Sequence, residues 1–171
     1  MLRHVADQLR FVAVAQNDPL AAPLLAELAV EYAERYAIDT ARVLAWLHGY
    51  PAEEFTSPDG ALLIGLSGAN RLYPAGQPVT GGAFRRFDAL TAELKRIWTD
   101  RAHRRHGYGR ALLTELEARI AARGYRRIYL TTGDQQPEAE ALYLSAGYVR
   151  LDKPLPGDRE ANPLAFLKEL A

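Results

Sequence analysis

The sequence predicts a single α/β (α+β) domain in which helices flank a mixed central sheet. Its length of 171 residues fits one domain. Strand-like and helix-like apolar patterns alternate along the chain, and no repeat or low-complexity linker divides it. We therefore expect residues 1–171 to form one domain.

In the first half we expect strands over residues 9–15, 61–66, 79–87 and 91–99. Asp18 followed by Pro19 is a helix-start signal, but Pro23 cannot lie inside a regular helix, so the first helix starts at one of the two prolines. A second helix is predicted over about 40–50, and residues 67–78 are predicted to form a loop.

In the second half a polar, glycine-bearing loop at 101–109 precedes a helix predicted to reach residue 123, where Gly124 fits a left-handed end. A strand over 126–132, a helix over 137–146 that Gly147 ends, and strands over 148–151 and 164–170 complete the prediction. In a regular strand Leu94 and Ile97 would point to opposite faces, so we expect a β-bulge there.

Composition limits the classes of function. Lys plus Arg and Asp plus Glu each number 21, so the chain lacks the net basic charge typical of nucleic-acid binding. The absence of cysteine excludes disulfides and thiolate catalysis. His103 and His106 are close in sequence but lack an evident Asp or Glu partner, so we expect no metal. The apolar run over 11–15 is too short for a signal or a membrane span, so we expect no membrane partner and a cytoplasmic location.

An anion site is predicted where the strand over 91–99 leads into the following helix. Residues 104–109 read Arg-Arg-His-Gly-Tyr-Gly, and the first turn of a helix has unpaired N–H groups and a partial positive charge. A Walker A loop and a Rossmann fingerprint both fit this segment badly. The alternative is a strand-to-helix turn whose arginines are merely solvated.

Three linked motifs carry a resemblance to a known family. Residues 104–109 match the pattern Gln/Arg-x-x-Gly-x-Gly/Ala, and Ala-Glu-Leu stands upstream at 92–94. Downstream, residues 136–148 read Gln-Pro-Glu-Ala-Glu-Ala-Leu-Tyr-Leu-Ser-Ala-Gly-Tyr, close to Asn-x-x-Ala-x-x-Leu-Tyr-x-x-x-Gly-Phe/Tyr. In this order and spacing the motifs resemble those of the GNAT superfamily of acetyl-coenzyme A-dependent N-acetyltransferases. The match is strong over residues 80–148.

The resemblance implies a GNAT-type central mixed sheet flanked by about four helices, with acetyl-coenzyme A as the acyl donor and no metal. It implies Glu93 as the general base, directly or through water, and Tyr143 as the acid toward the sulfur. It assigns coenzyme A contacts to Ile97, Trp98, Thr99, Arg104, Arg105, His106, Gly107, Tyr108, Gly109, Arg110, Ala111 and Gln136. Gln136 departs from the family's Asn, and Gln is not a favoured N-cap.

Each role has a structural alternative. Glu93 is equally well explained as a solvated strand residue or as the partner of Lys95, which shares its face, and Tyr143 as a core ring. The acceptor is expected to be an amine of a small molecule or peptide, in a pocket shaped by the first two helices through Glu31, Tyr32, Arg35, Tyr36 and Trp46. Arg85, Arg86 and Lys95 suit a carboxylate-bearing acceptor, although surface charge is the favoured interpretation.

Two functions from different classes stay open. One is an active N-acetyltransferase, with a homodimer as one possible assembly. The other is a non-catalytic acyl-coenzyme A-binding module that acts as a sensor or regulator. The presence of both Glu93 and Tyr143 favours the enzyme.

Overall fold

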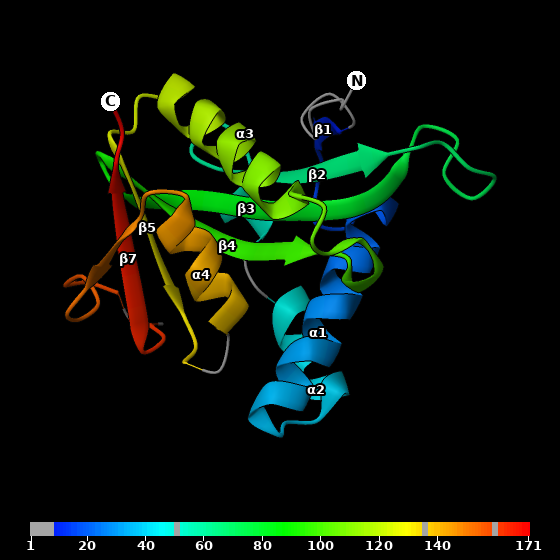
Figure 1. Ribbon diagram of the computed structural model, residues 1–171, viewed down its shortest axis with the longest axis horizontal. Coiled ribbons are helices and arrows are strands. Elements are labelled where there is room, and N and C mark those ends of the chain that lie inside the picture. The colour runs from blue at the N-terminus through cyan, green and yellow to red at the C-terminus, as the bar shows by residue number, and fades with distance from the viewer. Residues whose placement is uncertain (1–8, 50–51, 135–136, 159–160) are drawn as a thin grey trace.

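The computed structural model describes residues 9–49, 52–134, 137–158 and 161–171. Seven strands form one sheet in the order β1-β2-β3-β4-β5-β7-β6 (Figure 1). Their bounds are β1 Arg10–Ala13, β2 Ala61–Ser67, β3 Gln77–Asp88, β4 Thr91–Thr99, β5 Arg127–Thr132, β6 Val149–Leu151 and β7 Leu164–Glu169. The helices are α1 Ala22–Tyr36, α2 Thr40–His48, α3 Tyr108–Ala122 and α4 Pro137–Ser145, with short 3-10 turns at Pro19–Ala21, Ala52–Phe55 and Arg101–His103.

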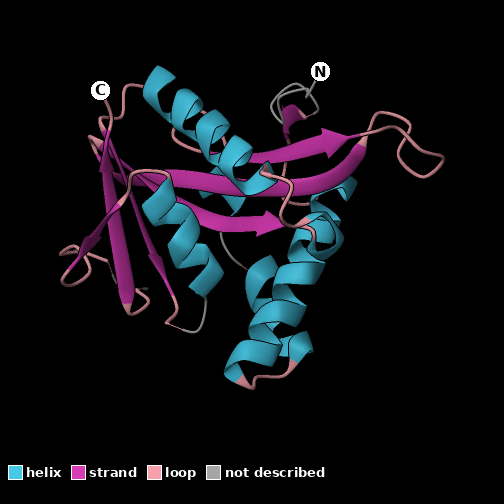
Figure 2. Cartoon of the chain, viewed as in Figure 1, coloured by secondary structure: helices cyan, strands magenta, loops and turns pink. Residues whose placement is uncertain are grey.

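The sheet is mixed, as the sequence predicts. All neighbouring strands run antiparallel except β4 and β5, which are parallel. Helices cover both faces (Figure 2). α1 and α2 pack on one face in a core that includes Leu62 and Ile64, while α3 and α4 pack on the other in a core that includes Leu63 and Phe84. The alternation along β2 separates the two cores, because successive side chains of a strand point to opposite faces.

Both candidate start signals of the first helix are used. The Asp18 carboxylate accepts a hydrogen bond from the backbone N–H of Leu20 at 2.9 Å and caps the turn Pro19–Ala21, and Pro23 then lies in the first turn of α1. Proline is tolerated there because the first N–H groups of a helix lack helical partners. α1 ends at Tyr36, and Ala37, which caps it, adopts a left-handed φ of 54°.

Other boundaries differ from the prediction by a few residues. α2 ends at His48, and residue 50 lies outside the described residues. The loop predicted over 67–78 is shorter, because β2 includes Ser67 and β3 begins at Gln77. The predicted left-handed residue after α3 is confirmed, with φ of 90° at Gly124. Gly147, predicted to end α4, follows it with φ of 92°.

The predicted bulge in β4 is confirmed at Arg96. This residue has φ of 58°, and the pairing of β4 with β3 shifts between Lys95, opposite Ala83, and Trp98, opposite Gly81. The extra residue returns Ile97 to the face of Leu94, against α3, and turns Trp98 toward α1. The Arg96 guanidinium holds the bulge by donating to the Gln16 side chain at 2.7 Å and to the Leu47 carbonyl.

Candidate active site

A large cleft opens where β4 and β5 part. The two strands pair at three positions only, the last joining Glu93 to Tyr129. Beyond that pair the strands separate, and a cleft of about 1030 Å³ lies between residues 94–99 of β4 and 130–132 of β5. α1 and α2 supply one wall and the start of α3 with α4 the other. The register of one parallel strand pair therefore fixes the position of this cleft.

The predicted anion loop lines this cleft at the start of α3. Arg105 and Gly107 adopt left-handed φ of 67° and 77°, and no side chain caps the helix at Gly107. The first helical bond runs from the Ala111 N–H to the Gly107 carbonyl at 3.1 Å. The N–H groups of residues 108–110 precede this bond, so they face the end of the helix, where an anion is favoured.

Two arginines of the loop and one at the start of α3 differ in what they bind. Arg104 pairs with Glu31 of α1 at 3.1 Å, and Arg110 of α3 donates to the Ser145 carbonyl of α4 at 2.6 Å. Arg105 is exposed and makes no ion pair within the described part of the chain. Arg104 thus joins the loop to α1 and Arg110 joins α3 to α4, while Arg105 keeps an unbalanced charge at the rim.

Most of the predicted site residues meet in the cleft. Its lining includes Ile97, Trp98, Thr99, Arg104, Arg105, Gly107, Tyr108, Gly109, Arg110 and Tyr143. His106 does not line it: this residue is exposed, with its ring 5.7 Å from that of Tyr108. Gln136 lies outside the described residues.

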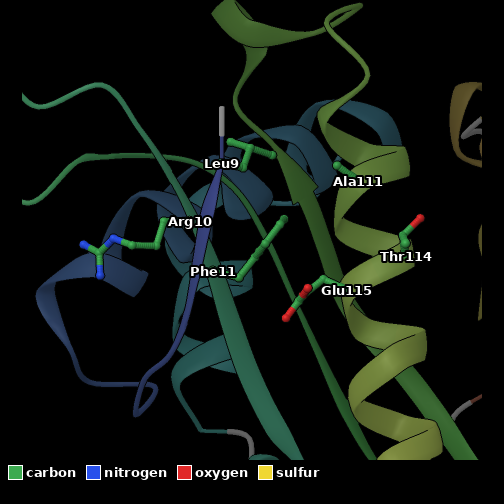
Figure 3. Close-up of a pocket in the computed structure, with 6 residues that line it drawn as sticks. All are labelled: Leu9, Arg10, Phe11, Ala111, Thr114 and Glu115. Atoms are coloured by element: carbon green, nitrogen blue, oxygen red, sulfur yellow. The ribbon is translucent and has the colours of Figure 1, made fainter. Parts of the chain in front are cut away.

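Ala111 faces a second, smaller pocket of about 370 Å³ between β1 and α3 (Figure 3). Phe11 of β1 and Glu115 of α3 both extend into the space between the strand and the helix, while Arg10 points away from α3. This pocket contains neither a helix N-terminus nor any of the other predicted site residues. It is a poor candidate for a binding site.

Tyr143 is both a core ring and a cleft residue. Its ring lies 5.7 Å from those of Tyr148 and Phe166, and only 5% of the residue is exposed. It also lines the cleft. Burial raises the pKa of the Tyr143 hydroxyl well above its usual value, and the nearby Tyr32 of α1 adds to the shift. The hydroxyl therefore keeps its proton at neutral pH.

Glu93 lies beside the cleft rather than in its lining. It is 1% exposed, and its Oε1 accepts a hydrogen bond from Arg85 Nε at 2.8 Å. The buried Oε2 accepts no hydrogen bond from the described residues and lies 3.5 Å from the ammonium of Lys95, which does line the cleft. The predicted pairing with Lys95 is thus present, and sequence reasoning missed the stronger contact with Arg85.

Contacts between α1 and the far side of the cleft were also missed. Arg35 pairs with Glu138 in the first turn of α4, and Tyr36 reaches Gly133 after β5. A Cβ atom at Gly133 would lie 1.5 Å from the Tyr36 hydroxyl, so a side chain there would displace the ring. No local pattern predicts these contacts, because they join residues about 100 positions apart.

The expectation that both loop histidines lack an acidic partner is wrong for His103. Its Nδ1 lies within hydrogen-bonding distance of Asp100, three residues earlier. Asp100 also lies near Glu27 of α1, whose pKa is raised by burial and by this second carboxylate. Among the described residues no group of three or more His, Asp or Glu side chains is placed to hold a metal.

Within the described ranges, no helix combines the length and the apolar character that a membrane crossing requires.

Comparison with known proteins places the chain among acetyltransferases. The model of the acetyltransferase (GNAT) family matches residues 23–148. No curated protein matches the chain by sequence. Several solved structures share its fold at low identity. A GNAT-family acetyltransferase from Staphylococcus aureus superposes with a TM-score of 0.72 at 16% identity, over 95% of this chain and 99% of the other.

Two further structures contain the thioester or its product. The PaiA N-acetyltransferase of Thermoplasma acidophilum in complex with coenzyme A has a TM-score of 0.71 at 16% identity, over 95% of this chain and 99% of its own. A GNAT-family acetyltransferase from Elizabethkingia anophelis with acetyl-coenzyme A bound has a TM-score of 0.62 at 17% identity, over 96% and 99%. At these identities the structures support the fold, and the family model supports membership over most of the chain. The chain therefore belongs to the acetyltransferase (GNAT) family and is an acyltransferase.

Proposed function

We propose that the protein transfers an acetyl group from acetyl-coenzyme A to a primary amine of a small molecule or peptide, by direct attack of the amine on the thioester. One observation carries the proposal. An uncapped helix N-terminus, the free edge of β4 and Tyr143 all meet in a single cleft. In this proposal the helix N-terminus receives the pyrophosphate of the donor, the edge of β4 receives its pantetheine arm, and Tyr143 faces its sulfur.

The donor is proposed to bind with its pyrophosphate at the N–H groups of residues 108–110 and beside Arg105. Its pantetheine arm would follow Ile97, Trp98 and Thr99, whose backbone edge toward β5 lies beyond the last strand pair. An extended amide-bearing chain can bind such an edge as an added strand. A backbone N–H of this segment would then stabilise the oxyanion.

Tyr143 is proposed as the general acid. The carbon–nitrogen bond forms, the carbon–sulfur bond breaks, and the departing thiolate takes the Tyr143 proton. Because its raised pKa keeps the hydroxyl protonated, Tyr143 has that proton to give. Of the three ammonium protons, one stays on the amide nitrogen, one leaves to solvent by way of the base, and one returns to Tyr143.

Glu93 is proposed as the base, acting through a water molecule. Direct contact is disfavoured because Lys95, not Glu93, lines the cleft. The buried Oε2 without a hydrogen bond suits a bound water, since buried polar atoms without protein partners commonly bind one. A relay of this kind would remove the proton from the ammonium without moving the carboxylate from Arg85.

A panel of primary amines with acetyl-coenzyme A, followed by release of the free thiol, tests the proposed function. Calorimetry with acetyl-coenzyme A is run in parallel. Thiol release that depends on the amine supports the enzyme. Tight binding of the thioester with no amine-dependent release would instead identify the non-catalytic acyl-coenzyme A-binding module.

A further inference from the structure

The half of the cleft that α1, α2 and the residues between them line, called here the acceptor half, contains exposed apolar side chains. Trp46 of α2 is 58% exposed and Ile38, between α1 and α2, is 47% exposed, and both line the cleft. Leaving large apolar side chains in water at the mouth of a cleft is typical of a binding surface. Tyr32 and Tyr36 continue this surface inward, with ring centroids 6.4 Å apart.

The acceptor half offers no spare negative charge. Glu31 and Glu138 are the acidic residues among the described residues that line the cleft. Glu31 pairs with Arg35 at 3.0 Å and with Arg104, and Glu138 pairs with Arg35. An acceptor with several ammonium groups would find no carboxylate free to balance them.

A positive charge is available at the mouth. Arg42 lies one helical turn before Trp46 on α2, and both line the cleft. Asp39 accepts a hydrogen bond from the backbone N–H of Arg42, at 3.2 Å. The Arg42 guanidinium itself makes no hydrogen bond or ion pair with any residue that the structure describes. A guanidinium is the side chain best suited to a carboxylate.

Arg42 and the proposed acid approach the cleft from opposite faces of the sheet. α2 packs in the core of one face, and Tyr143 belongs to the core of the other. A molecule that places its amine at Tyr143 and an anionic group at Arg42 must therefore hold the two at opposite ends. Tyr32, Tyr36 and Trp46 line the same cleft and offer aromatic rings to such a molecule.

We propose that the acceptor is a primary amine on an aromatic body that bears a carboxylate at the end opposite the amine. The inference rests on the proposed function and names its substrate class. Trp46 and the tyrosines contact the aromatic body, and Arg42 binds the carboxylate.

A matched pair of amines tests this. 4-(Aminomethyl)benzoate and benzylamine differ by one carboxylate, and spermidine represents the polycations. We expect kcat/KM, from thiol release with acetyl-coenzyme A, to be highest for 4-(aminomethyl)benzoate and about fivefold below it for benzylamine, the value of one rim ion pair. Spermidine should be the poorest of the three.

Variants assign the preference to residues. Arg42→Gln should remove the advantage of 4-(aminomethyl)benzoate over benzylamine. Trp46→Ala should lower both aromatic amines equally. Arg71→Gln is the matched control, because Arg71 is also exposed but lies in the β2–β3 loop, outside the cleft lining.

Equal kcat/KM for the matched pair, or an advantage that survives Arg42→Gln, would overturn the inference, as would a preference for spermidine. Failure of the proposed function is separable from these results. It would abolish thiol release with all amines, and calorimetry with 4-(aminomethyl)benzoate and benzylamine in the presence of coenzyme A would then measure the same Arg42-dependent difference as binding.

Discussion

Glu93→Gln separates the proposed chemistry from the structural role of the same side chain. The substitution keeps the shape and an oxygen that can accept the hydrogen bond from Arg85 Nε, now 2.8 Å from Oε1. It removes the charge that faces Arg85 and Lys95. Replacing a charge-assisted hydrogen bond with a neutral one costs about 1–1.5 kcal/mol, and the partly exposed Lys95 adds less than ~1 kcal/mol. We therefore expect the unfolding free energy to fall by about 2 kcal/mol in urea denaturation, with the fold retained.

The activity of this variant should depend on pH differently from that of the wild type. An alkylamine has a pKa near ~10.4, so only ~10⁻³ of it is neutral near pH ~7.4. Without a base the variant must use that fraction, and its kcat/KM should rise about tenfold per pH unit between pH ~7 and ~9. Near pH ~7 it should fall ~10²–10⁴-fold below the wild type, whose profile is flatter. Thiol release across this range measures both.

Glu54→Gln is the matched control for Glu93→Gln. Glu54 pairs with the same Arg85, at 2.5 Å, but is more exposed and does not line the cleft. It should change neither the rate nor the profile. If Glu93→Gln and the wild type share one profile and one rate, the amine arrives already neutral, and Glu93 serves only to hold Arg85 and Lys95.

Substitutions at three further positions test other parts of the structure. Tyr143→Phe keeps the ring contacts but removes the acid, so turnover should fall ~10²–10⁴-fold with the affinity for acetyl-coenzyme A nearly unchanged, and wild-type turnover would make this residue structural only. Gly109→Val adds a Cβ atom 3.3 Å from Leu142 Cδ2 and covers the N-terminal end of α3. Calorimetry should therefore record a severe loss of acetyl-coenzyme A affinity, while circular dichroism records a folded protein. Unchanged affinity would mean that the donor binds elsewhere. Arg96→Gly should retain more stability in urea than Arg96→Ala, by ~1 kcal/mol, because only glycine adopts the φ of 58° without strain. The opposite order would mean that the left-handed bulge is not maintained.

Local patterns predict those features that depend on near neighbours. The apolar parity of Leu94 and Ile97 predicted a bulge between them, because a strand's alternation can change only where a residue is inserted, and the structure places it at Arg96. The Gly pattern at the start of α3 located the anion loop, because glycine and an uncapped helix end are local properties. Glycines 124 and 147 ended their helices for the same reason.

Contacts between residues that are distant in the sequence could not be predicted from local patterns. The pairing of Arg104 with Glu31 joins residues 73 apart, and no pattern near either residue identifies the other. The pairing of Glu93 with Arg85 could have been found, since the short turn after Asp88 places the two residues opposite one another in β3 and β4. Counting back from that turn would have shown that the carboxylate has a cationic neighbour on each side.

The short parallel pairing of β4 with β5 separates two properties of the cleft, its position in the sheet and the side chains that line it. Three residue pairs hold the two halves of the sheet together, and the point where they stop fixes where the cleft opens. One wall of the cleft belongs to α1 and α2, which the sheet does not need for its own hydrogen bonds. Changes to the side chains that these helices present to the cleft can therefore alter its shape while the point where the strands part stays where it is. Under the proposed function, the place of reaction would follow from strand register, and the choice of acceptor from the side chains on this wall.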